Sequence, residues 1–409
     1  MEDLSFNELY AQSLGITAPW KVTRVQIKGD LKEVHVHVEC ARGEVWVNPK
    51  TQQRAQIKDW VERTWRHLDT LEYTTIVYAK VPRVQLSKFK SEMVAVPWAE
   101  PGGRFTRRFE ARLIDCLLAC QTVSGAAKLA SLTPDQIDGV MARAVRRGVE
   151  RRRLEPMAAV GLDEKAYRKG HCYLTVLTDL EGNRVLEVVP ERTTEAARLI
   201  LKTLPPKCRR SIEAVALDMW QPYQDAVAAE LPEASLVFDR FHVSKHLNEA
   251  VDKVRRKEHR ELSAAGDGTL QRTKYLWLKS RLDLRTQQGI VFRELLNEDL
   301  ETGSAWSLKE NFRHFWSYQR WTSGFRFLDK WIEAAHDSAL PPMQKVADLL
   351  ERHAEGLLNY LHYPITNAAS EGQNSRIQGL KTAARGLPKF ESLRSRILFF
   401  LGKLSLHPA

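Results

Sequence analysis

The sequence predicts a multidomain α/β protein in which a β-rich region, a helical region and a mixed strand and helix region follow one another. Apolar and polar residues alternate along much of residues 20–100, which is typical of strands. After Pro101-Gly102-Gly103 the apolar spacing becomes helical, and beyond residue 158 strand and helix patterns alternate. A chain of 409 residues is too long for one ordinary core, so several domains are expected.

Composition indicates a basic protein without a membrane segment. Lysine and arginine number 62 against 51 aspartate and glutamate, an excess of 11 that favours a polyanionic partner. No stretch of about 20 uncharged apolar residues occurs, and the acidic start does not resemble a signal peptide. We therefore expect a cytoplasmic protein with no membrane partner. The five cysteines form no Cys-x-x-Cys pair and are expected to be reduced thiols.

Residues 1–100 are predicted to form a β-rich N-terminal domain. His35 and His37 fall on one face of a predicted strand, near Cys40. No second cluster completes a tetrahedral metal site, so polar residues on an exposed strand face are the favoured interpretation. The predicted strands include Glu33–Cys40, Glu44–Pro49, Tyr73–Val84 and Met93–Trp98.

Residues 101–153 are predicted to form a helix-turn-helix followed by a basic linker. Thr133-Pro134-Asp135-Gln136 is a capping box with proline in the first helical position. Any three-helix packing unit would give the same pattern, but the basic end of the last helix favours DNA binding. The predicted helices are Phe109–Ala119, Ser124–Ala130 and Pro134–Arg147. The candidate DNA-binding residues here are Arg143, Arg146, Arg147, Arg151, Arg152 and Arg153, although such charge runs are as often simply solvated.

Residues 154–250 carry a βββαβαβ order, the layout of an RNase H-like sheet. Asp163 ends the apolar part of the first strand, and Asp218 follows the fourth. The first and fourth strands are neighbours in such a sheet, so the two carboxylates are expected to face each other. The predicted strands are Ala158–Leu162, His171–Leu180, Arg184–Pro190, a strand leading to Asp218, and Ser235–Phe238; the helices are Thr194–Thr203 and Pro222–Leu231.

Each acid in this region also has a purely structural interpretation. Asp163 could cap a turn together with Glu164, and Asp218 could cap the helix that follows it. Asp239 could pair with Arg240 or Lys245, and His242 could be an ordinary structural histidine. For a single acid the structural interpretation would be preferred; the joint placement of Asp163 and Asp218 at strand ends favours a functional one.

Residues 251–360 are predicted to be a helical insertion, and residues 361–409 to return to the core as helices. The five tryptophans at positions 277, 306, 316, 321 and 331 are expected mainly in helix-packing cores. In the helix predicted from Asn367 to Ala384, Glu371 and Asn374 share the polar side. Taken alone, this would be an ordinary surface helix. Candidate DNA contacts on it are Asn374, Arg376, Lys381 and Arg385.

Three acids on a rigid scaffold suit a two-metal phosphodiester enzyme. We therefore predict Asp163, Asp218 and Glu371 as catalytic residues and metal ligands. Carboxylates favour hard Mg²⁺ or Mn²⁺ over zinc.

Five motifs follow one another along nearly the whole chain. They are Trp98-Ala99-Glu100-Pro101-Gly102-Gly103-Arg104-Phe105-Thr106, Leu162-Asp163-Glu164, Leu217-Asp218-Met219-Trp220, Phe238-Asp239-Arg240-Phe241-His242-Val243 and Asn367-x3-Glu371-Gly372-x-Asn374. In this order they resemble the ISL-three family of bacterial insertion-sequence transposases. The resemblance implies a DDE transposase with an RNase H-like core, a helical insertion before the glutamate and N-terminal recognition of DNA ends. Its DDE triad corresponds to Asp163, Asp218 and Glu371.

One departure concerns zinc. The family usually carries an N-terminal zinc-binding domain with two cysteine pairs, but the corresponding positions are Asn48-Pro49-Lys50-Thr51 and Leu86-Ser87-Lys88-Phe89. Zinc is therefore not expected, and the domain is expected to hold together by packing alone.

The expected partners are double-stranded DNA, both transposon ends and target, and further copies of the chain in a dimer or higher assembly associated with the nucleoid. The alternatives are a regulator that keeps the fold without cutting DNA, and a nuclease acting on RNA or branched DNA.

Overall fold

The computed structural model describes residues 5–41, 44, 46–47, 54–87, 90–168, 172–365, 368–384 and 389–409. The chain divides into two compact units, which are described separately. Unit 1 comprises Met1–Arg152, Ala383–Phe400 and Leu404–Ala409, and unit 2 comprises Arg153–Thr382 and Leu401–Lys403. Among the described residues, no helix is both long and apolar enough to cross a membrane.

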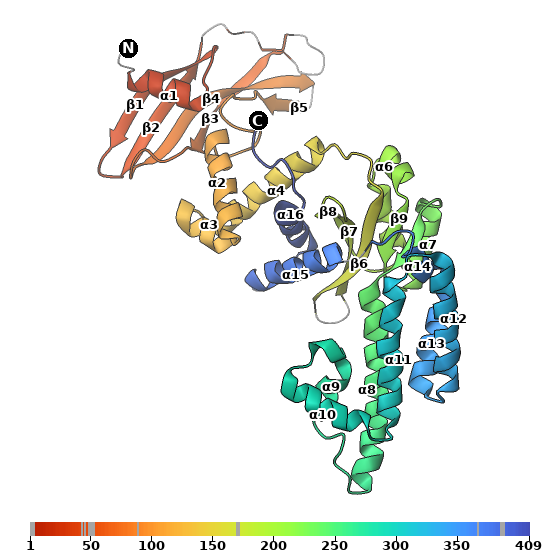
Figure 1. The fold of residues 1–409 in the computed structure, drawn as a ribbon. Helices are drawn as coiled ribbons and strands as arrows, with labels where there is room; N and C mark the ends of the chain where they lie inside the picture. The colour runs from red at the N-terminus through yellow and green to blue at the C-terminus, as the bar shows by residue number, and fades with distance from the viewer. Residues whose placement is uncertain are drawn as a thin grey trace. The chain divides into compact units, whose positions relative to one another are not determined.

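Unit 1 begins with a mixed β-sheet of strand order β1-β2-β4-β3, with β5 paired to β4 (Figure 1). The β2–β4 pairing is parallel and the others are antiparallel. One face is buried, because alternate residues of β2 (Val34, Val36 and Val38) point into a core that includes Trp65 and Trp98. The elements are α1 Phe6–Leu14, β1 Trp20–Lys28, β2 Glu33–Cys40, β3 Ile57–Arg66, β4 Thr74–Ser87 and β5 Lys90–Met93.

Strands are present across the region where they were predicted, with differences at two of them. In the segment Glu44–Pro49 the described residues form one isolated bridge, between Val47 and Arg54, and residues 45, 48 and 49 lie outside the described residues. The strand predicted at Met93–Trp98 ends at Met93. Beyond it Trp98 is buried edge-on against Trp20 and Trp65, so this segment serves the core rather than the sheet.

Three helices of unit 1 follow the sheet and contact one another pairwise. Each begins at a threonine whose hydroxyl accepts a backbone N–H, and at Thr133 the predicted capping box with Gln136 is present. The last helix continues to Arg151, four residues beyond the predicted end, so Arg151 is helical rather than part of a linker. The helices are α2 Arg107–Cys120, α3 Val123–Ala130 and α4 Pro134–Arg151.

The C-terminal segment divides between the units, whereas the sequence predicted that all of residues 361–409 return to the core. Helix α15 (Ala368–Ala383) belongs almost entirely to unit 2, while most of α16 (Phe390–Leu401) belongs to unit 1. Arg396 of α16 pairs with Asp138 of α4 at 3.0 Å, and Ile397 is fully buried. These contacts attach the end of the chain to the three helices of unit 1.

Unit 2 is built on a mixed sheet of strand order β10-β9-β6-β7-β8. Strands β6, β9 and β10 run parallel, and β6, β7 and β8 form an antiparallel meander. The prediction that the first and fourth strands are neighbours is confirmed by the β6–β9 pairing. The elements are β6 Ala159–Arg168, β7 Cys172–Asp179, β8 Arg184–Pro190, α5 Thr194–Lys202, α6 Pro206–Ser211, β9 Ala214–Leu217, α7 Gln221–Glu230 and β10 Ser235–Phe238.

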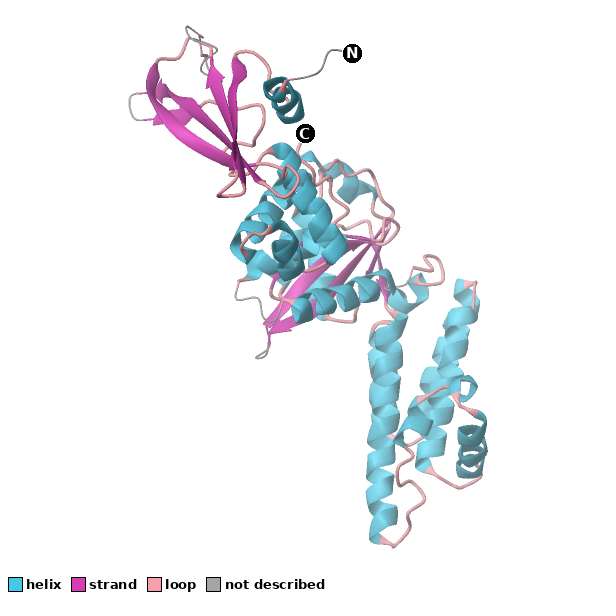
Figure 2. Cartoon of the chain, turned by 90° about the vertical axis from the view of Figure 1, so that its left-hand side faces the viewer, coloured by secondary structure: helices cyan, strands magenta, loops and turns pink. Residues whose placement is uncertain are grey.

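A series of helices follows β10, and the first begins at Arg240 rather than at residue 251, where the helical insertion was predicted to start (Figures 1 and 2). The 25-residue helix α8 contacts α11 and α13, and Trp277, Trp306 and Trp331 are buried among these helices. Trp321 differs, with 42% of its surface exposed. The helices are α8 Arg240–Ala264, α9 Lys274–Leu278, α10 Thr286–Leu296, α11 Glu301–Phe312, α12 Trp321–Asp337, α13 Pro341–Arg352 and α14 Ala354–Asn359.

The close packing of α14 on β10 gives a stability prediction. A Cβ atom at Gly356 would overlap the ring of Phe238, so we expect Gly356→Ala to destabilise the protein by about 1–3 kcal/mol. Gly303 of α11 has no atom within 4 Å of the corresponding position, so Gly303→Ala should be neutral or stabilising by up to about 1 kcal/mol. Urea unfolding of the two variants measures the difference. Equal stability of Gly356→Ala and the wild type would contradict the packing described.

Candidate functional site

Three aspartates stand in one row at an edge of the unit 2 sheet. Asp163 lies within β6, Asp218 directly follows β9, and Asp239 directly follows β10. The last β6–β9 pair is Gly161 with Ala216, and continuing this register by two residues places Asp163 opposite Asp218. The last β9–β10 pair is Leu217 with Phe238, and continuing it by one residue places Asp218 opposite Asp239. Parallel strands present their carboxyl ends at the same edge, so β9 and β10 bring the aspartates that follow them beside Asp163 of β6.

Each aspartate also accepts local backbone hydrogen bonds. Asp163 accepts from the N–H of Glu164 at 2.7 Å, and Asp218 from that of Trp220 at 3.1 Å. Asp239 caps α8 and lies 3.2 Å from His242, rather than pairing with Arg240 or Lys245 as considered above. The local bonds therefore orient carboxylates that the register has already brought together.

Helix α15 brings the third predicted acid to this edge. The amide of Asn374 donates to Oδ2 of Asp163 at 2.8 Å, and Gln373 donates to Asn183 at 2.8 Å. Ile377 is fully buried, as expected for the apolar side of the helix. Glu371, one turn before Asn374, is half-buried; burial first and the charge of Asp239 second raise the pKa of its carboxyl.

The site concentrates negative charge in a buried place. Burial raises the pKa of Asp163 to about 6, and the neighbouring charges of Asp218 and Asp239 act in the same direction. Burial also raises the pKa of Asp218. Burial would lower the pKa of His242, but its hydrogen bond with Asp239 and the nearby aspartates outweigh this effect and raise it.

The donor set fits a hard divalent cation. In the described part of the chain, no three His, Cys, Asp or Glu side chains are already arranged as ligands of one ion. Asp163 and Asp218 are nevertheless crowded acids whose charged forms are disfavoured by burial, and a cation would relieve this cost. Carboxylate oxygens are the ligands that Mg²⁺ and Mn²⁺ prefer.

Other residues of this region were not selected from the sequence. Arg192 pairs with Glu164 at 3.1 Å and lies over the rings of Tyr173 (4.0 Å) and Trp220 (5.1 Å). No local sequence pattern marks Arg192, because its partners come from other strands and loops. Asp239 could have been selected, since it follows a buried strand just as Asp218 does.

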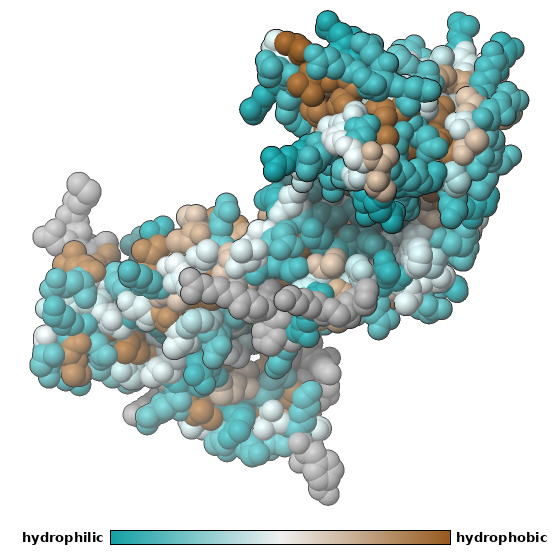
Figure 3. Space-filling model, turned by 90° about the horizontal axis from the view of Figure 1, so that it is seen from below, coloured by the Kyte–Doolittle hydropathy of each residue, from teal (hydrophilic) through white to brown (hydrophobic). Residues whose placement is uncertain are grey.

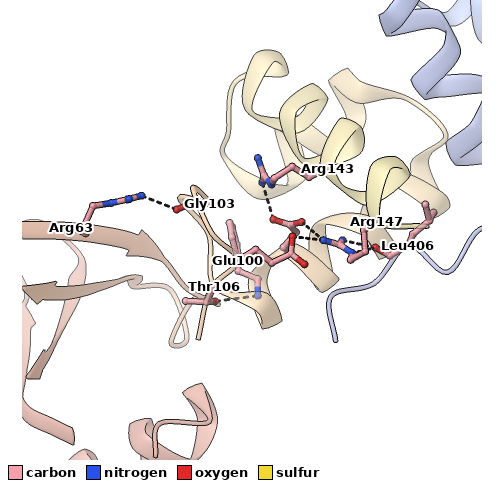
Figure 4. Close-up of polar contacts among 9 residues, drawn as sticks. Arg63, Glu100, Gly103, Thr106, Arg143, Arg147 and Leu406 are labelled. Carbon is pink, nitrogen blue, oxygen red and sulfur yellow. Dashed lines mark hydrogen bonds and ion pairs between the residues drawn. The ribbon is translucent and has the colours of Figure 1, made fainter. Parts of the chain in front are cut away.

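The predicted DNA-binding residues fall into two groups, and the first consists of two arginines of α4 that pair with glutamates. Arg147 is buried, and its guanidinium contacts Glu100 at 2.6 Å, Glu110 at 3.2 Å and the carbonyl of Leu406 at 3.0 Å (Figure 4). Arg143 pairs with Glu110 at 2.8 Å. These guanidinium groups hold unit 1 together from the inside, so their contacts favour a structural role over phosphate binding.

The remaining candidates lie nearer the surface. Arg146, Arg153 and Arg376 are exposed, and no ion pair involving them occurs among the described residues. Arg151 donates to the carbonyl of His407 at 2.8 Å, and Lys381 to that of Ala166 at 2.7 Å. Arg152 is half-buried, and Arg385 lies outside the described residues.

The buried arginine cluster generates a second stability prediction. Arg147→Met would leave Glu100 and Glu110 short of a buried cation, so we expect a loss of about 3 kcal/mol. The matched variant Arg146→Met removes an exposed arginine of the same helix and should change stability by less than about 0.5 kcal/mol. Urea unfolding measures both. Equal free energies of unfolding for the two variants would contradict the prediction that the buried ion pairs of Arg147 stabilise unit 1.

Comparison with protein families gives three matches along the chain. The transposase domain of the DDE type found in family ISL3 matches residues 160–397, more than half of the chain. The helix-turn-helix domain of transposase family ISL3 matches residues 94–145. The zinc-finger of transposase IS204/IS1001/IS1096/IS1165 matches residues 51–85.

The zinc-finger match bears on the expectation about zinc. It identifies the β3–β4 region as the counterpart of a zinc-finger domain, so the domain itself is present. The matched residues contain no cysteine and one histidine, His67, which is buried and lies 2.8 Å from the hydroxyl of Thr106. The absence of bound zinc therefore stays a prediction.

Relatives agree with the domain matches. The transposase for insertion sequence element IS1001 from Bordetella parapertussis is 28% identical over 338 residues, covering 81% of this chain and 82% of that protein. The transposase for insertion sequence element IS1557 from Mycobacterium tuberculosis is 26% identical over 356 residues, covering 81% and 80%.

The family resemblance of the sequence motifs is thus confirmed, together with a DNA-cleaving transposase activity and a helix-turn-helix for binding DNA. The chain belongs to the ISL3 family of insertion-sequence transposases.

Proposed function

We propose that Asp163, Asp218 and Glu371 are the catalytic acids and that together they hold Mg²⁺ or Mn²⁺. The observation that carries this proposal is the parallel register, which puts Asp163 and Asp218 opposite each other at one sheet edge. The hydrogen bond from Asn374 to Asp163 supports the inclusion of Glu371, because both residues lie on the polar side of α15. The raised pKa values of the three acids, with burial as the largest cause, fit a cation site.

We further propose that unit 2 has an RNase H-like core. Three antiparallel strands followed by two parallel ones, in the order β10-β9-β6-β7-β8, support this assignment. The first acid in the first strand and the second acid after the fourth agree with the layout expected from the sequence.

The chemistry proposed is hydrolysis followed by transfer. Bound Mg²⁺ would lower the pKa of the attacking water and stabilise the departing oxygen. Hydrolysis of one phosphodiester at an element end leaves a 3′-hydroxyl and a 5′-phosphate. The 3′-hydroxyl then displaces one ester oxygen of a target phosphodiester, so one bond forms for each that breaks and no covalent protein intermediate is needed.

The protein's own residues would set the geometry of these steps. Local backbone hydrogen bonds orient the carboxylates of Asp163 and Asp218, and the Asn374 amide donates to Oδ2 of Asp163. The guanidinium of Arg192, which pairs with Glu164 and lies over the rings of Tyr173 and Trp220, provides a fixed positive charge beside the acids. Such supporting contacts restrict the rotamers of the ligands before an ion or substrate arrives.

Double-stranded DNA is the proposed partner, as element end and as target, and the protein would work in the cytoplasm on the nucleoid. The net charge of +11 supports a polyanionic partner, and the face shown in Figure 3 is largely hydrophilic with scattered apolar patches. Joining two element ends to one target needs two active sites, which supports a dimer or higher assembly.

The experiment that tests the proposal compares the wild type with Asp218→Asn on labelled DNA carrying the element's own ends, with Mg²⁺. We expect the wild type to cut and join the DNA and the variant to bind it but to lose at least about 100-fold of the cleavage rate, since a charged ligand is removed. Asp225→Asn, an exposed acid on α7, is the matched control and should cut normally.

The wild type binding DNA without cutting it under either Mg²⁺ or Mn²⁺ would instead favour the non-cutting regulator. Normal cutting by Asp218→Asn would remove Asp218 from the proposed site.

Asn374 permits a sharper prediction, because the sequence suggested a DNA contact whereas its hydrogen bond suggests support of Asp163. We expect Asn374→Ala to lower the cleavage rate about 10- to 100-fold without changing DNA affinity, as is usual when the residue orienting a metal ligand is removed. Ser375→Ala, an exposed neighbour on α15, should change neither quantity. A loss of affinity at an unchanged cleavage rate of bound DNA would show that Asn374 acts as a DNA contact.

A further inference from the structure

Unit 1 contains a groove lined by arginines between its sheet and its helices. The groove has a volume of about 610 Å³, and we call it the arginine groove. Arg63 and Arg66 come from β3, and Arg104 from the segment that precedes α2. On the other side lie Ser131, in the turn between α3 and α4, and Gln136, in the first turn of α4.

Backbone hydrogen bonds hold the arginines beside one another. The N–H of Arg66 donates to the carbonyl of Arg104 at 3.0 Å, and the N–H of Thr106 donates to the carbonyl of Arg66 at 3.0 Å. The end of β3 and the start of α2 are therefore joined as neighbouring extended segments. Because these contacts are made by backbone, the spacing of the arginines does not depend on side-chain rotamers.

A tight turn delivers Arg104 to the groove. The N–H of Gly103 donates to the carbonyl of Glu100 at 2.9 Å, and Gly102 has a φ of +74°, which favours glycine. A Cβ atom at Gly103 would lie 3.0 Å from that same carbonyl oxygen. Arg63 then donates to the carbonyl of Gly103 at 3.1 Å (Figure 4). This accounts for the Glu100-Pro101-Gly102-Gly103-Arg104 part of the sequence motif by its geometry.

The charge of the groove is positive. Its lining contains three arginines and one acid, Glu62, which lies 3.4 Å from Lys80. Arg66 pairs at 2.5 Å with Asp69, which is half exposed. Arg104 is exposed, and within the described residues its guanidinium has no ion-pair partner. An anion entering the groove would therefore meet uncompensated positive charge.

The position of the groove matters because two of the α4 arginines already pair with glutamates. Arg143 and Arg147 are held by Glu100 and Glu110 inside unit 1. A helix-turn-helix that docks on DNA still needs phosphate contacts on either side of the helices, and these set its orientation. The arginine groove opens beside the turn that leads into α4, where such contacts are required.

We propose that the arginine groove binds the phosphate backbone of duplex DNA through Arg104, within the helix-turn-helix match, and through Arg66 of the zinc-finger counterpart, without cysteine ligands. This inference rests on DNA binding by the helix-turn-helix, and it adds the surface that accompanies the helices. The contact is with phosphate, so it is independent of base sequence.

The test measures binding of the full chain to a fluorescent mixed-sequence duplex of about three helical turns, in EDTA so that no cleavage occurs. Affinity is determined between roughly 50 and 200 mM salt. We expect Arg104→Ala to weaken binding several-fold and to reduce the slope of log K against log salt by about 1, the value for one lost phosphate contact. Arg104→Lys should restore most of the slope, and Arg104→Glu should weaken binding further.

Arg24→Ala is the matched control, since Arg24 is also exposed but lies on β1, at the opposite edge of the sheet from β3. It should bind with the wild-type slope. The proposal is overturned if Arg104→Ala keeps the wild-type affinity and slope, or if Arg24→Ala loses as much. Failure of the wild type to bind any duplex would overturn DNA binding by unit 1 as a whole, whereas loss of cleavage with intact binding would concern only the acids of unit 2.

Discussion

The parallel pairing of β6, β9 and β10 is the constraint on which the catalytic unit depends. It places the residues that directly follow β9 and β10 beside the middle of β6. Aspartate occupies all three of these positions: Asp163 within β6, Asp218 after β9 and Asp239 after β10. Crowding acids in a buried place is unfavourable, as the raised pKa values of Asp163 and Asp218 show. The sheet core holds this arrangement because β9 and the part of β6 before Asp163 are apolar and buried, and Val237 and Phe238 at the end of β10 are buried as well.

In unit 1 the buried charges are paired, whereas the buried acids of unit 2 are gathered together. The buried cluster of unit 1 consists of Glu100, Glu110, Arg143 and Arg147, and the carbonyl of Leu406 completes the shell of Arg147. Acid and base are matched, so the cluster is closed, and its function is to fix α2, α4 and the C-terminal residues against one another. Positive charge that is free to meet DNA must then come from elsewhere in the unit, at exposed positions such as Arg104 and Arg146.

The sequence was sufficient for most of the regular structure because local signals mark it. Arg184–Pro190 and Ser235–Phe238 were predicted at their observed bounds, since turn residues flank short apolar runs. The capping box at Thr133 located the start of α4 for the same local reason. The short helix α6 was not predicted, because six residues carry too little periodicity.

Long-range partners explain what the sequence did not supply. Arg147 looks like any basic helix residue until Glu110, 37 residues away, and Leu406, 259 residues away, are brought beside it. The same holds for the bond between Asn374 and Asp163, which are 211 residues apart. The polar side of α15 was predictable from its spacing, but whether that side faces solvent, DNA or an acid depends on tertiary packing.

The helical insertion explains how Asp218 and Glu371 can be far apart in sequence and still reach the same edge of the sheet. Its first helix, α8, begins at the cap formed by Asp239, and its last, α14, packs back on β10. Asn359 at the end of α14 donates to the carbonyl of Leu236 within β10, so the insertion leaves the sheet and returns to it at the same strand. The distance in sequence between the second and third proposed acids therefore imposes little cost on their meeting, because both ends of the intervening helices are anchored to the strand next to Asp218. Changes in the middle of the insertion can then alter its outer surface without moving the acids, whereas changes at its two anchors act directly on the edge of the sheet where the acids stand.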